Sequence, residues 1–80
     1  MKVHVKLFAS LRKYAPADLT TERVIVDVPP GAAVRDAIAA LGIPAEHARM
    51  IVSQEGQLEP SAALVDGQQL DIFPPLAGGR

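Results

Sequence analysis

The chain has no cysteine, few aromatic residues and no long apolar run. Without cysteine, its 80 residues can form no disulfide, thiolate metal site or nucleophilic thiol. Aromatic residues make up only 4% against 49% apolar residues, so the core must be aliphatic. The charged start, MKVHVK, is unlike a signal peptide, and no apolar run approaches membrane-spanning length. We therefore expect one small, soluble, cytoplasmic domain without a membrane partner.

Charge is unevenly distributed along the chain. Residues 1–13 carry a net charge of +4 and the remainder carries −5, which together give the overall −1. A nucleic-acid-binding module usually has a stronger basic excess with interleaved aromatic residues, so we expect no nucleic-acid partner. The asymmetry fits either a docking surface or an ordinary solvated face.

Side chains for catalysis or metal binding are scarce. His4 and His47 are the only histidines, and no carboxylate lies at zinc-ligand spacing from them, so no metal site is expected. Ser10, Ser53 and Ser61 lack the surroundings of a nucleophile motif. The sequence therefore predicts a protein with no catalytic side chains of its own, rather than an enzyme.

Alternating apolar residues predict strands at 2–9 and 22–28, which an irregular loop over 10–21 joins as an antiparallel hairpin. Further short extended segments are expected at 50–52 and near residue 58. The last strand is expected at 69–73.

One helix is expected between Ala33 and Gly42. Val34, Ala37, Ile38 and Leu41 have the i, i+3, i+4, i+7 spacing of a single buried helix face. Gly42 is suited to end the helix, although no Ser, Thr or Asp stands at its start as a cap. Residues 45–49 are expected to form one further helical turn.

This element order predicts an α+β fold, in which one main helix packs on one face of a mixed sheet. Burial is greatest if the first and last strands lie side by side at the sheet centre, which is the β-grasp, or ubiquitin-like, architecture. Phe8 and Phe73 then lie on neighbouring strands and point away from the helix, and clustered apolar residues on a surface usually mark an interface. The expected core consists of Val3, Val5, Leu7, Val24, Val26, Val28, Val34, Ile38, Leu41, Ile51, Leu70 and Ile72.

The last strand leads into a distinctive end. Pro74 and Pro75 cannot donate to a sheet ladder and hold the chain extended, while Gly78 and Gly79 have no Cβ and fit a narrow channel. We therefore divide the chain into a domain over 1–75 and a flexible tail over 76–80. A frayed terminus is the alternative explanation for this composition.

The chain resembles the MoaD/ThiS family of ubiquitin-like sulfur carriers. Residues 5–12 (VKLFASLR) are similar to the first strand and turn of the small subunit of molybdopterin synthase. Residues 64–79 (LVDGQQLDIFPPLAGG) are similar to that subunit's last turn, strand and tail. The ending Phe-Pro-Pro-x-x-Gly-Gly is the more specific of the two matches.

The resemblance implies a function in which a ubiquitin-activating-type enzyme uses ATP and Mg to adenylate Gly79, which then becomes a thiocarboxylate. This chain itself would bind no cofactor. Gly78 would be the channel neighbour of Gly79, and the residues that dock on partners would be Phe8, Phe73, Pro75 and Leu76. The partners implied are that adenylating enzyme and the molybdopterin synthase large subunit.

Arg80 departs from the family pattern, because it holds the Gly79 carboxyl group in a peptide bond. The resemblance implies that a metallopeptidase removes it before activation. The alternatives are a carrier for another pathway, such as thiamine or cysteine synthesis, and a ubiquitin-like binding module that is never activated.

Overall fold

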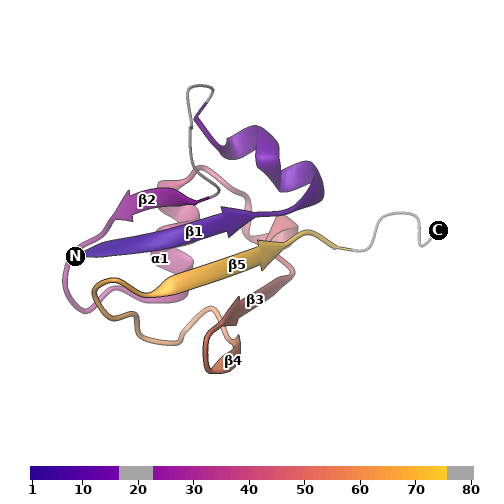
Figure 1. Ribbon diagram of the computed structural model, residues 1–80. Coiled ribbons are helices and arrows are strands. Elements are labelled where there is room, and N and C mark those ends of the chain that lie inside the picture. Colours follow the sequence, from indigo (N-terminus) through magenta and orange to yellow (C-terminus); the bar gives the residue numbers. More distant parts are fainter. Residues whose placement is uncertain (17–22, 76–80) are drawn as a thin grey trace.

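In the part of the chain that the structure describes, a five-stranded sheet forms the body of the protein and an α-helix covers one of its faces (Figure 1). The computed structural model describes residues 1–16 and 23–75. The strands are β1 (Lys2–Leu7), β2 (Val24–Asp27), β3 (Met50–Ser53), β4 (Gly56–Leu58) and β5 (Gln69–Phe73). The helices are α1 (Val34–Ala40) and two 3₁₀ helices, η1 (Ala9–Tyr14) and η2 (Ala45–His47).

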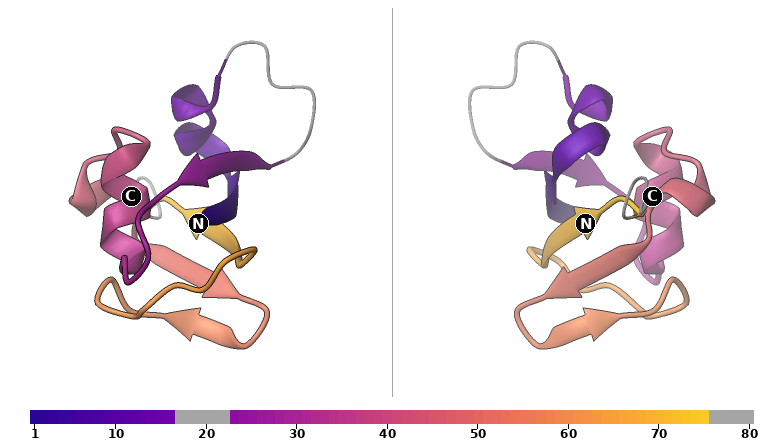
Figure 2. Two further views of the ribbon diagram at one scale, coloured as in Figure 1. Left: turned by 90° about the vertical axis from the view of Figure 1, so that its left-hand side faces the viewer. Right: turned by 90° about the vertical axis from the view of Figure 1, so that its right-hand side faces the viewer.

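The strand order is β2-β1-β5-β3-β4, so the first and last strands are neighbours near the centre. β1 pairs with β5 in parallel, with Val5 opposite Leu70 and Leu7 opposite Ile72. β1 pairs with β2 antiparallel, which confirms the predicted hairpin. The packing of α1 on one side of this sheet is clear in Figure 2. The predicted β-grasp fold is therefore correct.

The core lies between α1 and the sheet. Eleven of the twelve predicted core residues are buried, and Val3, Val5, Val34, Leu70 and Ile72 are completely inaccessible. Leu41 is the exception: it is only half-buried because it is the C-cap of α1. Additional buried apolar residues are Leu11, Ala32, Ala33, Ala37, Ile43, Ala48 and Leu64.

The segment after β1 corrects the prediction of an irregular loop. Ala9 has a φ of 52°, a left-handed conformation that ends the strand at Leu7 rather than at residue 9. A 3₁₀ helix follows over Ala9–Tyr14, and its Leu11 side chain, 1% exposed, packs into the core. The burial of Leu11 stabilises a 3₁₀ helix that no local sequence pattern predicts. Ala15 and Pro16 follow it without regular structure, and residues 17–21 of the predicted loop lie outside the described residues.

The side chain that caps the start of α1 belongs to a residue inside the helix, not to the residue before it. Asp36 supplies the missing cap, because its Oδ2 accepts a hydrogen bond from the Ala33 backbone N–H at 2.7 Å. At the other end Gly42 has a φ of 77°, the left-handed conformation that commonly follows a helix. None of the helices in residues 1–16 and 23–75 has the length and hydropathy to cross a membrane.

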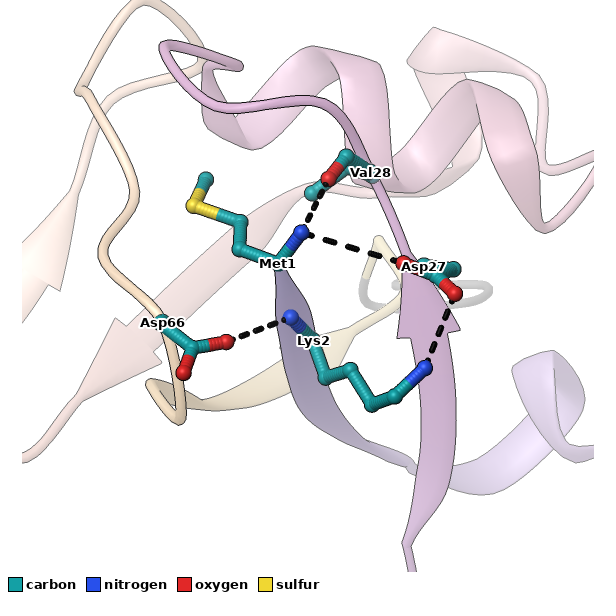
Figure 3. Close-up of polar contacts among 5 residues, drawn as sticks. All are labelled: Met1, Lys2, Asp27, Val28 and Asp66. Atoms are coloured by element: carbon teal, nitrogen blue, oxygen red, sulfur yellow. Dashed lines mark hydrogen bonds and ion pairs between the residues drawn. The ribbon is translucent and has the colours of Figure 1, made fainter.

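A polar cluster ties the start of β1 to two other segments (Figure 3). The Met1 amino group donates to the Val28 carbonyl at 2.8 Å, and the Lys2 backbone N–H donates to Asp66 Oδ1 at 2.7 Å. Lys2 Nζ lies 2.8 Å from Asp27 Oδ2, and this hydrogen bond lowers the pKa of the Asp27 carboxyl and raises the pKa of Lys2. These contacts fix the end of the sheet that lies opposite the Pro-Pro segment.

Candidate docking surface at the root of the tail

Phe8 and Phe73 come together on the sheet face that α1 does not cover. Leu7 is paired with Ile72, and the Phe8 N–H continues the ladder to the Ile72 carbonyl at 3.2 Å. The two rings are stacked, with centroids 4.3 Å apart and planes inclined by 16°. The predicted pairing of these aromatic residues is thus correct, although both are half-buried rather than fully exposed.

Met50 extends the apolar surface beside the two rings. It is paired with Phe73 across β3 and β5, and it is 45% exposed. We call Phe8, Phe73 and Met50 the aromatic patch. Met50 was not among the docking residues predicted from the sequence, although the alternation Met50-Ile51-Val52 around a buried Ile51 indicates its place on the outer face.

Arg23 and Asp71 bridge the outer face next to the aromatic patch. Arg23 Nη2 lies 3.0 Å from Asp71 Oδ1, although β1 runs between β5, which carries Asp71, and β2, which Arg23 immediately precedes. Arg23 Nη1 also donates to the backbone carbonyls of His4 and Leu70, at 3.4 and 3.2 Å. Because both side chains are partly shielded from water, this bridge fixes the central strands more firmly than a fully exposed ion pair would.

The chain leaves the sheet beside the aromatic patch. The Arg49 N–H donates to the Phe73 carbonyl at 2.9 Å, which fixes the last residue before the Pro-Pro segment. Pro74 is half-buried, and Pro75, which was predicted to dock on partners, is exposed. The other tail residues assigned from the sequence, Leu76, Gly78, Gly79 and Arg80, lie outside the described residues.

A groove of about 240 Å³ lies between the two 3₁₀ helices and the Pro-Pro segment. Leu11 and Tyr14 of η1 and both prolines give it apolar surface, and Lys13 and His47 supply polar groups at its lining. We call this feature the tail-root groove. Sequence analysis could not predict it, because it depends on the 3₁₀ helix that local signals did not show.

The described residues offer two surfaces on which a partner could dock, the aromatic patch and the tail-root groove. Among residues 1–16 and 23–75, no group of three or more His, Cys, Asp and Glu side chains could hold a metal ion. The features that gather at one end of the sheet are the aromatic patch, the tail-root groove and the Pro-Pro segment.

We expect the aromatic stack to contribute measurably to stability. In a double-mutant cycle of Phe8→Ala and Phe73→Ala, the coupling free energy of unfolding should be about 0.5–1.5 kcal/mol, as for other stacked aromatic pairs. Urea unfolding of the parent, both single variants and the double variant measures it. A coupling of zero would contradict the observed stacking.

Comparisons with known proteins agree with this geometry. The model of the family described as Mut7-C ubiquitin matches residues 1–78. Among curated proteins, RnfH of Burkholderia mallei (strain NCTC 10229) is 46% identical over 59 residues, which cover 66% of this chain. The matched part spans only 54% of that relative's length.

Two solved structures extend the likeness over nearly the whole chain. SAMP1 from Haloferax volcanii is 29% identical with a TM-score of 0.71, and the match covers 99% of this chain and 100% of that one. A protein from Pyrococcus furiosus described as molybdopterin converting factor, subunit 1, is 26% identical with a TM-score of 0.70. That match covers 95% of this chain and 99% of the other. These relatives are small ubiquitin-like proteins that share the complete fold.

Proposed function

Because this chain belongs to the Mut7-C ubiquitin family and is a ubiquitin-like protein of the MoaD/ThiS type, we propose that it carries sulfur as a thiocarboxylate on Gly79. The observation that supports this most is the aromatic patch at the point where the Pro-Pro segment, which precedes Gly78 and Gly79 in the sequence, leaves the sheet. A carrier needs this combination, because it must dock on a partner while its tip enters the partner's active site.

The chemistry requires a free carboxylate on Gly79. A carboxylate oxygen attacks the α-phosphorus of ATP, so a C–O–P linkage forms and pyrophosphate leaves. A sulfur nucleophile at the oxidation level of hydrosulfide then attacks the acyl carbon, which forms a C–S bond and expels AMP. An adenylating enzyme supplies the Mg·ATP site and the catalytic groups, so this chain contributes the carboxylate and the docking surface.

Arg80 must be removed before that reaction. It engages the Gly79 carboxyl group in a peptide bond, and hydrolysis of this bond releases the carboxylate. We assign the cleavage to a partner metallopeptidase. We propose the cytoplasm, where ATP is available, as the site of activation.

We further propose that the sulfur goes to molybdopterin, with the large subunit of molybdopterin synthase as the receiving partner. The likeness to a protein described as molybdopterin converting factor, subunit 1, supports this choice. The second candidate is a binding module that docks without being activated. The 46% identity to RnfH over 59 residues favours that candidate, since RnfH is not described as a sulfur carrier.

Binding of the adenylating enzyme tests the docking part of the proposal. Phe8→Ala and Phe73→Ala should each weaken its binding by more than about 1 kcal/mol, as truncated interface aromatics commonly do. Calorimetric titration with the enzyme measures the loss. Ile25→Ala is a suitable control, because Ile25 is 58% exposed on the edge strand β2 and lies outside the aromatic patch. Equal affinity of all three variants and the parent would remove the patch from the docking surface.

A further inference from the structure

Cations gather around the root of the tail. Arg12 and Lys13 form the last turn of η1, and Lys13 also lines the tail-root groove. Arg49 is exposed and precedes β3, where its backbone is bonded to Phe73. Lys6 Nζ lies 5.1 Å from the centre of the Phe8 ring. Thus η1, β1 and the segment before β3 each bring positive charge to the same end of the sheet.

Acidic side chains in the described part of the chain gather elsewhere or are already engaged. Asp27 and Asp66 contact Lys2 at the opposite end of β1, and Asp36 caps α1. Glu55 lies in the β3–β4 turn, on the side of β3 away from Phe73.

Three acids remain near the tail end. Asp71 is paired with Arg23 at 3.0 Å, whereas Glu46 of η2 and Glu59, which follows β4 beside the start of β3, are exposed. In contrast, Arg12, Lys13 and Arg49 make no ion pair within the described residues. Arg12, Lys13 and Arg49 therefore leave an excess of positive charge at the tail end, whereas Asp27 and Asp66 at the opposite end are matched by Lys2 and the Met1 amino group.

We propose that the tail end is a docking surface for an acidic protein surface, one that inserts an apolar side chain into the tail-root groove. The groove of about 240 Å³ has an apolar lining from Leu11, Tyr14 and the two prolines, with Lys13 and His47 beside it. Carboxylates of the partner would meet Arg12, Lys13 and Arg49 around this apolar contact. Such complementarity mainly accelerates association and selects the partner, and salt screens it. The inference does not require Gly79 to be activated.

The shape of the surface favours a protein over a nucleic acid. Single-stranded nucleic acids bind through aromatic faces on which bases stack. Here the Phe8 and Phe73 rings stack on each other, and Lys13 Nζ lies 5.5 Å from the Tyr14 ring centre. The basic end also belongs to a chain with net charge −1, which opposes nonspecific attraction to a polyanion.

Nuclear magnetic resonance titration of the full chain tests the proposal with defined probes. The first probe is a peptide of glutamates around a central leucine, the second has lysines in place of the glutamates, and the third is a single-stranded RNA oligonucleotide. The glutamate peptide should shift amide signals of residues 10–14, 47–49 and 73, and binding should weaken as salt is raised. The lysine peptide should leave those signals unchanged.

Charge reversals localise the effect. Lys13→Glu and Arg49→Glu should each weaken binding of the glutamate peptide by about fivefold. Arg35→Glu is the matched control: it makes the same change in net charge at an exposed position on α1, and should leave binding nearly unchanged. Equal effects of all three reversals, or equal binding of both peptides, would overturn the proposal. Tighter binding of the RNA at the same residues would also overturn it, by assigning the surface to nucleic acid.

Discussion

Replacing Ile38 by alanine should lower the free energy of unfolding by about 2–5 kcal/mol, a large part of the stability of so small a domain. Ile38 is 5% exposed and lies on the face of α1 that packs against the sheet. Truncation removes apolar surface from the core and leaves a cavity, since neighbouring aliphatic side chains can only partly refill the space. Urea unfolding monitored by circular dichroism measures the change.

The matched control is Ile25→Ala, which removes the same atoms from a side chain that is 58% exposed. Its cost should stay below about 1 kcal/mol, because little apolar surface leaves the core. Because both variants lose the same atoms, the difference between their free energies of unfolding measures the contribution of burial. Equal losses would contradict the placement of α1 over the sheet.

The sequence predicted the central part of the fold because alternation is strong there. Val3, Val5 and Leu7 alternate with polar residues in β1, and Leu70 and Ile72 do so in β5. Such patterns leave only one face to bury, so they determine both the orientation and the register of the strands. The same alternation predicted that Phe8 and Phe73 lie on neighbouring strands and point away from the helix.

The parts that were missed depend on contacts between distant residues. The 3₁₀ helix η1 forms where Leu11 reaches the core and Ala9 adopts a left-handed conformation, and neither has a local sequence signal. The tail-root groove depends on η1 and was missed with it. Likewise, the bridge from Arg23 to Asp71 spans a strand that separates them, and composition alone cannot reveal it.

A second large expected effect, on sulfur loading, concerns the residue that follows Gly79. A chain that ends at Gly79 should be adenylated and sulfurated, whereas the chain with Arg80 should not react at all. The reason is chemical rather than conformational: attack on the α-phosphorus of ATP needs a carboxylate on Gly79, and the peptide bond to Arg80 removes it. Addition of the metallopeptidase should convert the unreactive chain into the reactive one.

A matched control keeps the terminal carboxylate free but adds bulk to the tip that must enter the channel of the adenylating enzyme. Gly79→Ala in the chain that ends at residue 79 retains a carboxylate, yet adds a methyl group at the tip. If the tip must enter a narrow channel, this variant should react much more slowly than the parent. Unchanged rates would show that the channel tolerates a side chain.

Intact-mass measurement of the chain ending at Gly79 tests the central claim most directly. The chain is incubated with its adenylating enzyme, Mg·ATP and a sulfide donor, and a parallel reaction omits ATP. The account predicts a mass increase that corresponds to exchange of one oxygen for sulfur, only with ATP, and localised by fragmentation to Gly79. An unchanged mass with an adenylating enzyme that sulfurates its own known carrier would contradict it and favour the binding module that is never activated.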